Sequence, residues 1–157
     1  MNNLILSLVA GLGATLAIGV LSYAEVSLTE VVLLMAPFGA TAVLVFGVPS
    51  SPLAQPKNVI IGHFITASIG IAFSQYVEIT PITLAIATGL GVSAMLITKT
   101  THPPAGANPI LIMASGQGWS FLFTPVLIGA VVIVLVGKAL QLLLSQYLNP
   151  RLNGQKT

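Results

Sequence analysis

Two histidines lie inside otherwise apolar sequence, and each stands next to a stretch rich in proline and small polar residues. His102 belongs to the run THPPAGANP at positions 101–109, and His63 follows a second proline-rich stretch at positions 49–58. An imidazole has an ordinary pKa near 6.5, so its charge changes close to neutral pH. Ionisable side chains within hydrophobic segments are costly and mark paths for ions or substrates. The residues therefore indicate a site that moves a solute.

The rest of the inventory argues against an enzyme. Aspartate and cysteine are absent, and the only carboxylates are Glu25, Glu30 and Glu78, which lie near the predicted outer ends of apolar segments. Two histidines without a carboxylate nearby make a poor acid–base or metal site, and no phosphate-binding glycine loop occurs. We therefore expect no catalytic residue, no metal and no cofactor.

Composition places both histidines in a membrane domain. Hydrophobic residues make up 55% of the chain and charged residues 5%, and the mean hydropathy is +1.02. Eight charged residues without a basic, aromatic-rich patch give no reason to expect a nucleic-acid partner. A spanning helix needs about 20 mostly apolar residues, and the candidates are residues 4–21, 31–48, 59–76, 82–98 and 122–144. They leave no room for a separate soluble domain, so residues 1–157 are predicted to form one all-α polytopic membrane domain in contact with the lipid bilayer.

Charge predicts the topology. Basic residues collect on the cytoplasmic side, which places Lys57, Lys99 and the basic tail inside, and the N-terminus with them. Two crossings must then lie between Lys99 and the tail, and the short stretch 105–115, about 17 Å long as a helix, has to be one of them. The alternative is a re-entrant loop with five full spans. The first segment could also be a signal peptide, but it lacks the basic start of one.

A short internal match supports six crossings. PFGAT at positions 37–41 resembles PAGAN at positions 104–108, and proline at both places fits the first turn of a helix and breaks a longer one. We predict two broken or half-helices, at Pro37 and Pro104, in a 3+3 inverted repeat of residues 1–77 and 78–150, with a cytoplasmic tail at 151–157. Such repeats bring half-helix N-termini together near the membrane midplane, where they favour an anion. The alternative is a chance match in Gly- and Pro-rich sequence.

The proline-rich linker at 49–58 carries hydrogen-bond donors and could form a gate beside the site. The alternative is that it forms only a rigid cytoplasmic turn. His102 either supplies charge or bonds a carbonyl freed by the prolines, and His63 either faces the path or packs between helices. The two lysines either attract anions or mark topology. Small residues on the first segment predict close helix packing, within the chain or between protomers of a homo-oligomer. The full predicted permeation site is Gly39, Ala40, Thr41, Ser51, Gln55, Lys57, Asn58, His63, Lys99, Thr101, His102, Gly106, Ala107 and Asn108.

The stretches SPLAQPKN (51–58), GH (62–63) and HPPAGA (102–107) closely resemble the HPP family of integral membrane proteins, which is named for its His-Pro-Pro triplet. The resemblance covers nearly the whole chain. Plastid and cyanobacterial members are associated with nitrite transport, so the resemblance implies nitrite as the substrate. It also implies that the protein lies in the plasma membrane of a bacterium, most simply a cyanobacterium. The family is commonly described with four spans, whereas the six crossings come from this chain's own pattern. Two other classes stay open: a scaffold that transports nothing, and a channel for a neutral solute such as urea or ammonia.

Overall fold

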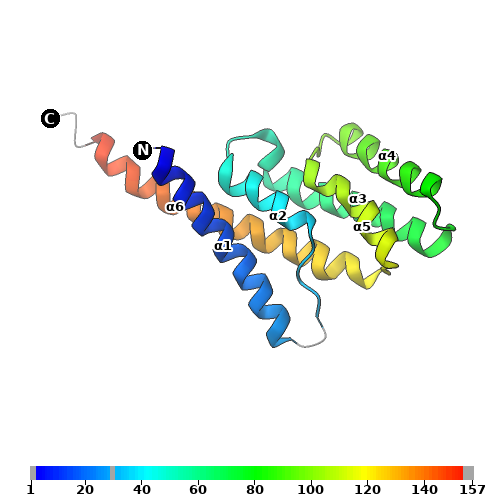
Figure 1. Ribbon diagram of the computed structural model, residues 1–157. Helices are drawn as coiled ribbons and strands as arrows, with labels where there is room; N and C mark the ends of the chain where they lie inside the picture. Colours follow the sequence, from blue (N-terminus) through cyan, green and yellow to red (C-terminus); the bar gives the residue numbers. More distant parts are fainter. Residues whose placement is uncertain (1–2, 29–30, 154–157) are drawn as a thin grey trace.

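The computed structural model describes residues 3–28 and 31–153, without the side chains of 147–153. Every regular element in these ranges is helical (Figure 1). The longer helices are α1 (Asn3–Ser27), α3 (Pro56–Tyr76), α4 (Pro81–Ile97) and α6 (Ile128–Asn153). The shorter elements are α2 (Pro37–Ala42), the π-helix η1 (Val43–Gly47), the 3-10 helices η2 (Pro52–Ala54) and η3 (Pro103–Ala107), α5 (Asn108–Ser115) and the π-helix η4 (Leu122–Leu127). The prediction of an all-α polytopic membrane protein is confirmed.

Within the described ranges, three helices are long and apolar enough to cross a membrane: Asn3–Ser27, Pro56–Tyr76 and Leu122–Gln146. Pro37–Gly47 and Pro81–Ile97 are shorter apolar helices, and α5 is shorter still. The three long helices are thus separated by shorter or broken ones, α2 with η1 between α1 and α3, and α4 with α5 between α3 and the last long helix. The number of crossings and the inverted repeat stay predictions.

The predicted break at Pro37 is confirmed. Residues 31–35 are not helical, and α2 begins with Pro37 in its first turn, where the missing proline N–H costs nothing. The second break begins one residue earlier than predicted, at Pro103, with the 3-10 turn η3, and α5 follows from Asn108. A third break was not predicted: Thr124, before Pro125, leaves helical geometry in η4, as a residue preceding proline tends to do.

A carboxylate from α1 holds the non-helical segment that leads to α2. Glu25 Oε2 accepts the backbone N–H groups of Leu33 and Leu34, each at 2.8 Å. The sequence placed this residue near the outer end of an apolar segment and gave no sign of these bonds. Glu30, the other acidic residue of this connection, lies outside the described residues, as does Lys156 in the tail.

Helix α3 lies at the centre of the fold, packed against α4, α5, η3 and η4, while α1 packs mainly on α6 and η1. Figure 1 shows α1 crossing α6, with α3, α4 and α5 grouped together and α2 between α1 and this group, while the start of α6 also reaches α3. The chain segment before η3 comes very close to α3, because a Cβ on Gly62 would lie 2.9 Å from the Thr100 carbonyl oxygen and 3.1 Å from His102 Cβ. This glycine lets His102 approach α3.

Candidate functional site

Five polar side chains are fully buried together between α2, α3 and the η3–α5 segment. We call this group the polar centre; its members are Thr41, His63, Thr66, His102 and Asn108. Polar groups removed from water need hydrogen-bond partners. The partners that these residues find are mostly one another, although the chain brings them from three separate segments.

Thr41 of α2 joins the two histidines. Its hydroxyl oxygen lies 2.8 Å from Nε2 of His63 and 2.9 Å from Nε2 of His102. The two imidazole rings stand edge to face, with centroids 5.0 Å apart and an interplanar angle of 64°. Phe38, the neighbour of the α2 break, presents its ring edge-on to His63 at 5.4 Å.

The hydrogen bonds have one consistent direction when both imidazoles are neutral. His102 Nδ1 lies 2.8 Å from the Leu53 carbonyl oxygen, which only accepts, so Nδ1 carries the hydrogen and Nε2 accepts from the Thr41 hydroxyl. That hydroxyl has a single hydrogen, so His63 Nε2–H must donate to Thr41. His63 Nδ1 is then an acceptor, and the Asn108 amide nitrogen, 3.0 Å away, donates to it.

Asn108 ends the chain of hydrogen bonds that begins at the Leu53 carbonyl and runs through His102, Thr41 and His63. Its Nδ2 also lies 3.1 Å from the His63 carbonyl oxygen and 3.0 Å from Oγ1 of Thr66, whose own hydroxyl donates to the Gly62 carbonyl at 2.9 Å. Three acceptors around one nitrogen fix the orientation of the amide. Asn108 Oδ1, on the other side, is buried and has no hydrogen-bond partner. A buried acceptor without a donor is costly. This oxygen is therefore the atom of the polar centre that could accept a hydrogen bond from a bound solute.

The predicted linker folds back against the polar centre, but the side chains of Ser51 and Gln55 hydrogen-bond within the linker itself. Ser51 accepts from the Leu53 amide at 3.2 Å, and the Gln55 amide donates to the Pro49 and Ser51 carbonyls at 3.1 and 3.0 Å. These bonds hold the Leu53 carbonyl where His102 meets it. The linker thus reaches the site through a backbone oxygen that no sequence motif could reveal.

Three more predicted residues lie outside the polar centre: Lys57 and Asn58 at the end of the linker, and Lys99. Asn58 donates to the Thr101 carbonyl at 2.9 Å and so ties α3 to the segment that carries His102. Lys57 and Lys99 are exposed; Lys57 lies in the first turn of α3, and Lys99 lies just beyond the end of α4. Thr66 was missed by sequence reasoning, although its position three residues after His63 puts both on one face of α3.

The two predicted helix starts border a single apolar groove of about 580 Å³. Ala36, Pro37 and Ala40 form one wall, and Pro103, Pro104 and Ala107 belong to the other, which α5 extends. The Gly39 amide, a predicted anion donor, bonds the Ala36 carbonyl at 3.1 Å, and the Ala105 amide bonds the His102 carbonyl at 2.9 Å. An anion at these helix starts would have to share those bonds. Gly106 is half-buried, and the amide of Asn108 bonds the Ala105 carbonyl.

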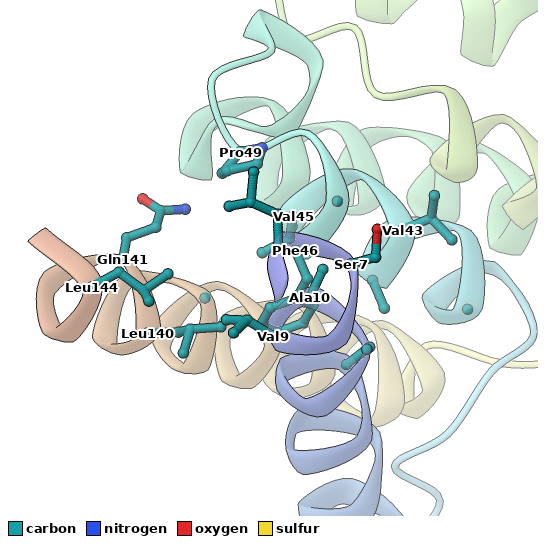
Figure 2. A pocket seen from close by; sticks show the side chains of 17 residues that line it. Ser7, Val9, Ala10, Val43, Val45, Phe46, Pro49, Leu140, Gln141 and Leu144 are labelled. Carbon is teal, nitrogen blue, oxygen red and sulfur yellow. The ribbon is translucent and has the colours of Figure 1, made fainter. Parts of the chain in front are cut away.

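A second apolar cavity, of about 600 Å³, lies between α1, the α2–η1 segment and α6 (Figure 2). Ser7 and Gln141 are the polar side chains labelled there, among Val9, Ala10 and Leu140. None of the polar-centre residues lines it.

Gly13 of α1 is packed against Phe46 and Leu140. The close helix approach predicted for the small residues of α1 is therefore confirmed at this position within the chain.

Comparison with known proteins decides the family. The family model of the HPP transmembrane region matches residues 2–148. The chain belongs to the HPP family. Two transmembrane proteins of Dictyostelium discoideum are 36% and 35% identical to it over 128 residues, which is 76% of this chain and 45% and 41% of theirs. The HPP-family chain thus spans less than half the length of these curated relatives. No solved structure matches it.

The His-Pro-Pro triplet of this HPP-family chain contributes to both the polar centre and the apolar groove between the two helix starts. His102 turns into the polar centre, whereas Pro103 and Pro104 start η3 and line the groove. Among the described residues no group of three or more histidine, cysteine or acidic side chains could hold a metal ion. Because the polar centre has imidazoles and no carboxylate, its only charged form is positive.

Proposed function

We propose that this HPP-family membrane protein transports a small monovalent anion, with nitrite as the first candidate. The observation that carries the proposal is the fully buried pair of imidazoles without a carboxylate. A charge buried in a membrane domain needs a counter-charge. The polar centre can become positive and never negative, so the ion that fits it is an anion. Nitrite comes from the resemblance to plastid and cyanobacterial members.

The surroundings of the site support an anion as well. Lys57 and Lys99 are exposed at the end of the molecule from which the linker reaches His102. Charges of one sign around an entrance raise the local concentration of the opposite ion. His63 lies seven residues into α3, about 10 Å from this end. Glu78 follows the far end of α3, and no acidic residue lies on α2, α3 or η3.

One observation favours a different solute. The open Asn108 Oδ1 accepts hydrogen bonds and cannot donate them. A neutral solute with N–H groups, such as urea or ammonia, would satisfy this oxygen, whereas nitrite would need a water between them. A neutral-solute channel is therefore the second candidate.

The test is entry of nitrite and, separately, urea into proteoliposomes that hold the pure protein. His102→Ala and Asn108→Ala should lower saturable nitrite entry at least tenfold. Thr15→Val, an exposed threonine on α1 that bonds only its own helix, should leave it unchanged. Urea entry without nitrite entry would select the neutral-solute channel. Folded protein with no flux above that of empty liposomes would leave a scaffold as the function.

A further inference from the structure

We infer that His102 carries one proton together with the anion, while His63 stays neutral and holds Thr41 in place. The inference rests on the proposed function, because it concerns how the same site moves its substrate. It follows from a difference between the hydrogen-bond partners of the two imidazoles, which otherwise look alike.

The partners of His102 accept its protonated form without any movement of heavy atoms. Nδ1–H already donates to the Leu53 carbonyl. A proton on Nε2 would donate to Thr41 Oγ1, and the Thr41 hydroxyl would turn to the Pro37 carbonyl oxygen, 3.1 Å away. Thr41 would then accept from both histidines, for which its oxygen has two lone pairs. Rotation of one hydroxyl hydrogen is the only change needed.

The partners of His63 exclude its protonated form. Nε2 already donates to Thr41, so a second proton would have to bind Nδ1, which faces the amide nitrogen of Asn108 at 3.0 Å. Two N–H groups would then point at each other. The amide cannot turn over to relieve this contact, because its oxygen would then face the His63 carbonyl oxygen, 3.1 Å from the atom that it replaces.

Among the described residues, no charged side chain is placed to balance a proton on His102. The elements packed against the imidazoles are α2, α3, α4, α5, η2 and η3, and their only charged side chain is Lys57, with Lys99 in the loop after α4. Both are exposed, and both are positive. The anion itself is left as the counter-charge, so proton uptake and anion binding favour each other.

The step is a proton transfer without redox chemistry. A proton from water forms the N–H bond at His102 Nε2 as the anion binds. That bond breaks and the proton returns to water when the anion leaves on the other side. One negative and one positive charge cross together, so the cycle carries no net charge.

The experiment measures nitrite entry and internal pH together in proteoliposomes, at about pH 7.5 and with the membrane potential set by potassium and valinomycin. Empty liposomes correct for nitrous acid that leaks through lipid. The wild type should acidify the interior by one proton per nitrite, at a rate that does not depend on the potential. His63→Gln, which keeps an N–H for Thr41, should lower the rate several-fold and keep the ratio. His102→Gln should lose the proton, so that any remaining nitrite entry is slowed by an inside-negative potential.

A spectroscopic measurement on the wild type tests the inference even if a variant fails to fold. In ¹⁵N-histidine NMR spectra, added nitrite should convert one imidazole to the doubly protonated form and leave the other as the Nε2–H tautomer. His63→Gln should retain the signal that converts. Nitrite entry without protons, or conversion of the His63 signal, would overturn the inference and leave anion transport standing. Absence of nitrite entry in the wild type would instead refute the proposed function.

Discussion

Within the described residues, Thr41 is the only side chain that hydrogen-bonds to both imidazoles, so the geometry of the site depends on one hydroxyl. A hydroxyl both donates and accepts, which lets it join two rings of opposite role. An ionised carboxylate at this position would only accept hydrogen bonds, and an amide would need two separate atoms to donate and to accept. Thr41 belongs to α2, whereas the rings belong to α3 and to the start of η3, so the same atom also fixes the position of the α2 break.

We expect Thr41→Val to lower both stability and transport. Valine keeps the shape and leaves Nε2 of each histidine without its partner, which costs about 1–3 kcal/mol for each unsatisfied buried group. Thr41→Ser keeps the hydroxyl and should retain most of the stability. Thermal unfolding in detergent measures the difference, with the exposed Thr15→Val as control. Equal unfolding temperatures for Thr41→Val and Thr15→Val would show that the Thr41 bonds contribute little.

At this scale the sequence predicts the members of the site better than their contacts. His63, His102, Thr41 and Asn108 all stand out as polar residues in apolar stretches. Nothing in the spacing says that a threonine from α2 lies between two rings that are 39 positions apart in the chain, because that contact depends on how three segments pack. The Leu53 carbonyl is invisible to any reading of residue types.

Among the elements, the non-helical segment 31–35 makes the broken helix possible. Backbone groups in a membrane domain need partners when no helix supplies them, and Glu25 supplies two of the missing bonds from a neighbouring helix. The prolines explain where the helices start, and this was predictable. The carboxylate that stabilises the non-helical approach to α2 was not, because glutamate near a helix end has many ordinary roles.

We expect Glu25→Ala to destabilise the fold by about 1–3 kcal/mol for each of the two amides it strands. Hydrogen exchange at Leu33 and Leu34 should become faster at the same time. Glu78→Ala is the matched control, because it removes an exposed carboxylate from the loop between α3 and α4. Thermal unfolding combined with exchange mass spectrometry makes the comparison. Similar behaviour of the two variants would mean that the Glu25 bonds do not hold the segment.

On the scale of the whole molecule, the long helices α1, α3 and α6 are separated by shorter or broken helices, and α3 lies at the centre of the fold. The sequence predicts the class and the order of these elements from hydropathy and proline alone. It does not predict that α1 and α6 pack mainly on each other while α3 binds most of the other elements, since this arrangement depends on the fit of side chains such as Phe46 against Gly13.

The predicted topology can be tested directly because the chain has no cysteine. Lys57→Cys and Lys99→Cys should react with a membrane-impermeant thiol reagent from the same side, and Glu78→Cys from the opposite side, because α3 and α4 are each predicted to cross the membrane between them. Ser145→Cys distinguishes the crossing numbers. Labelling from the side of Lys99 fits six crossings, whereas labelling from the side of Glu78 fits the re-entrant loop with five spans.

The bond between His102 and the Leu53 carbonyl has a consequence for how this protein tolerates mutation. The contact uses a main-chain atom, so replacing the half-buried Leu53 side chain leaves it in place. Inserting or deleting one residue between Ser51 and Gln55 would move the carbonyl by about 3.8 Å, farther than a hydrogen bond can stretch. The length of the linker is therefore more constrained than the identity of its residues.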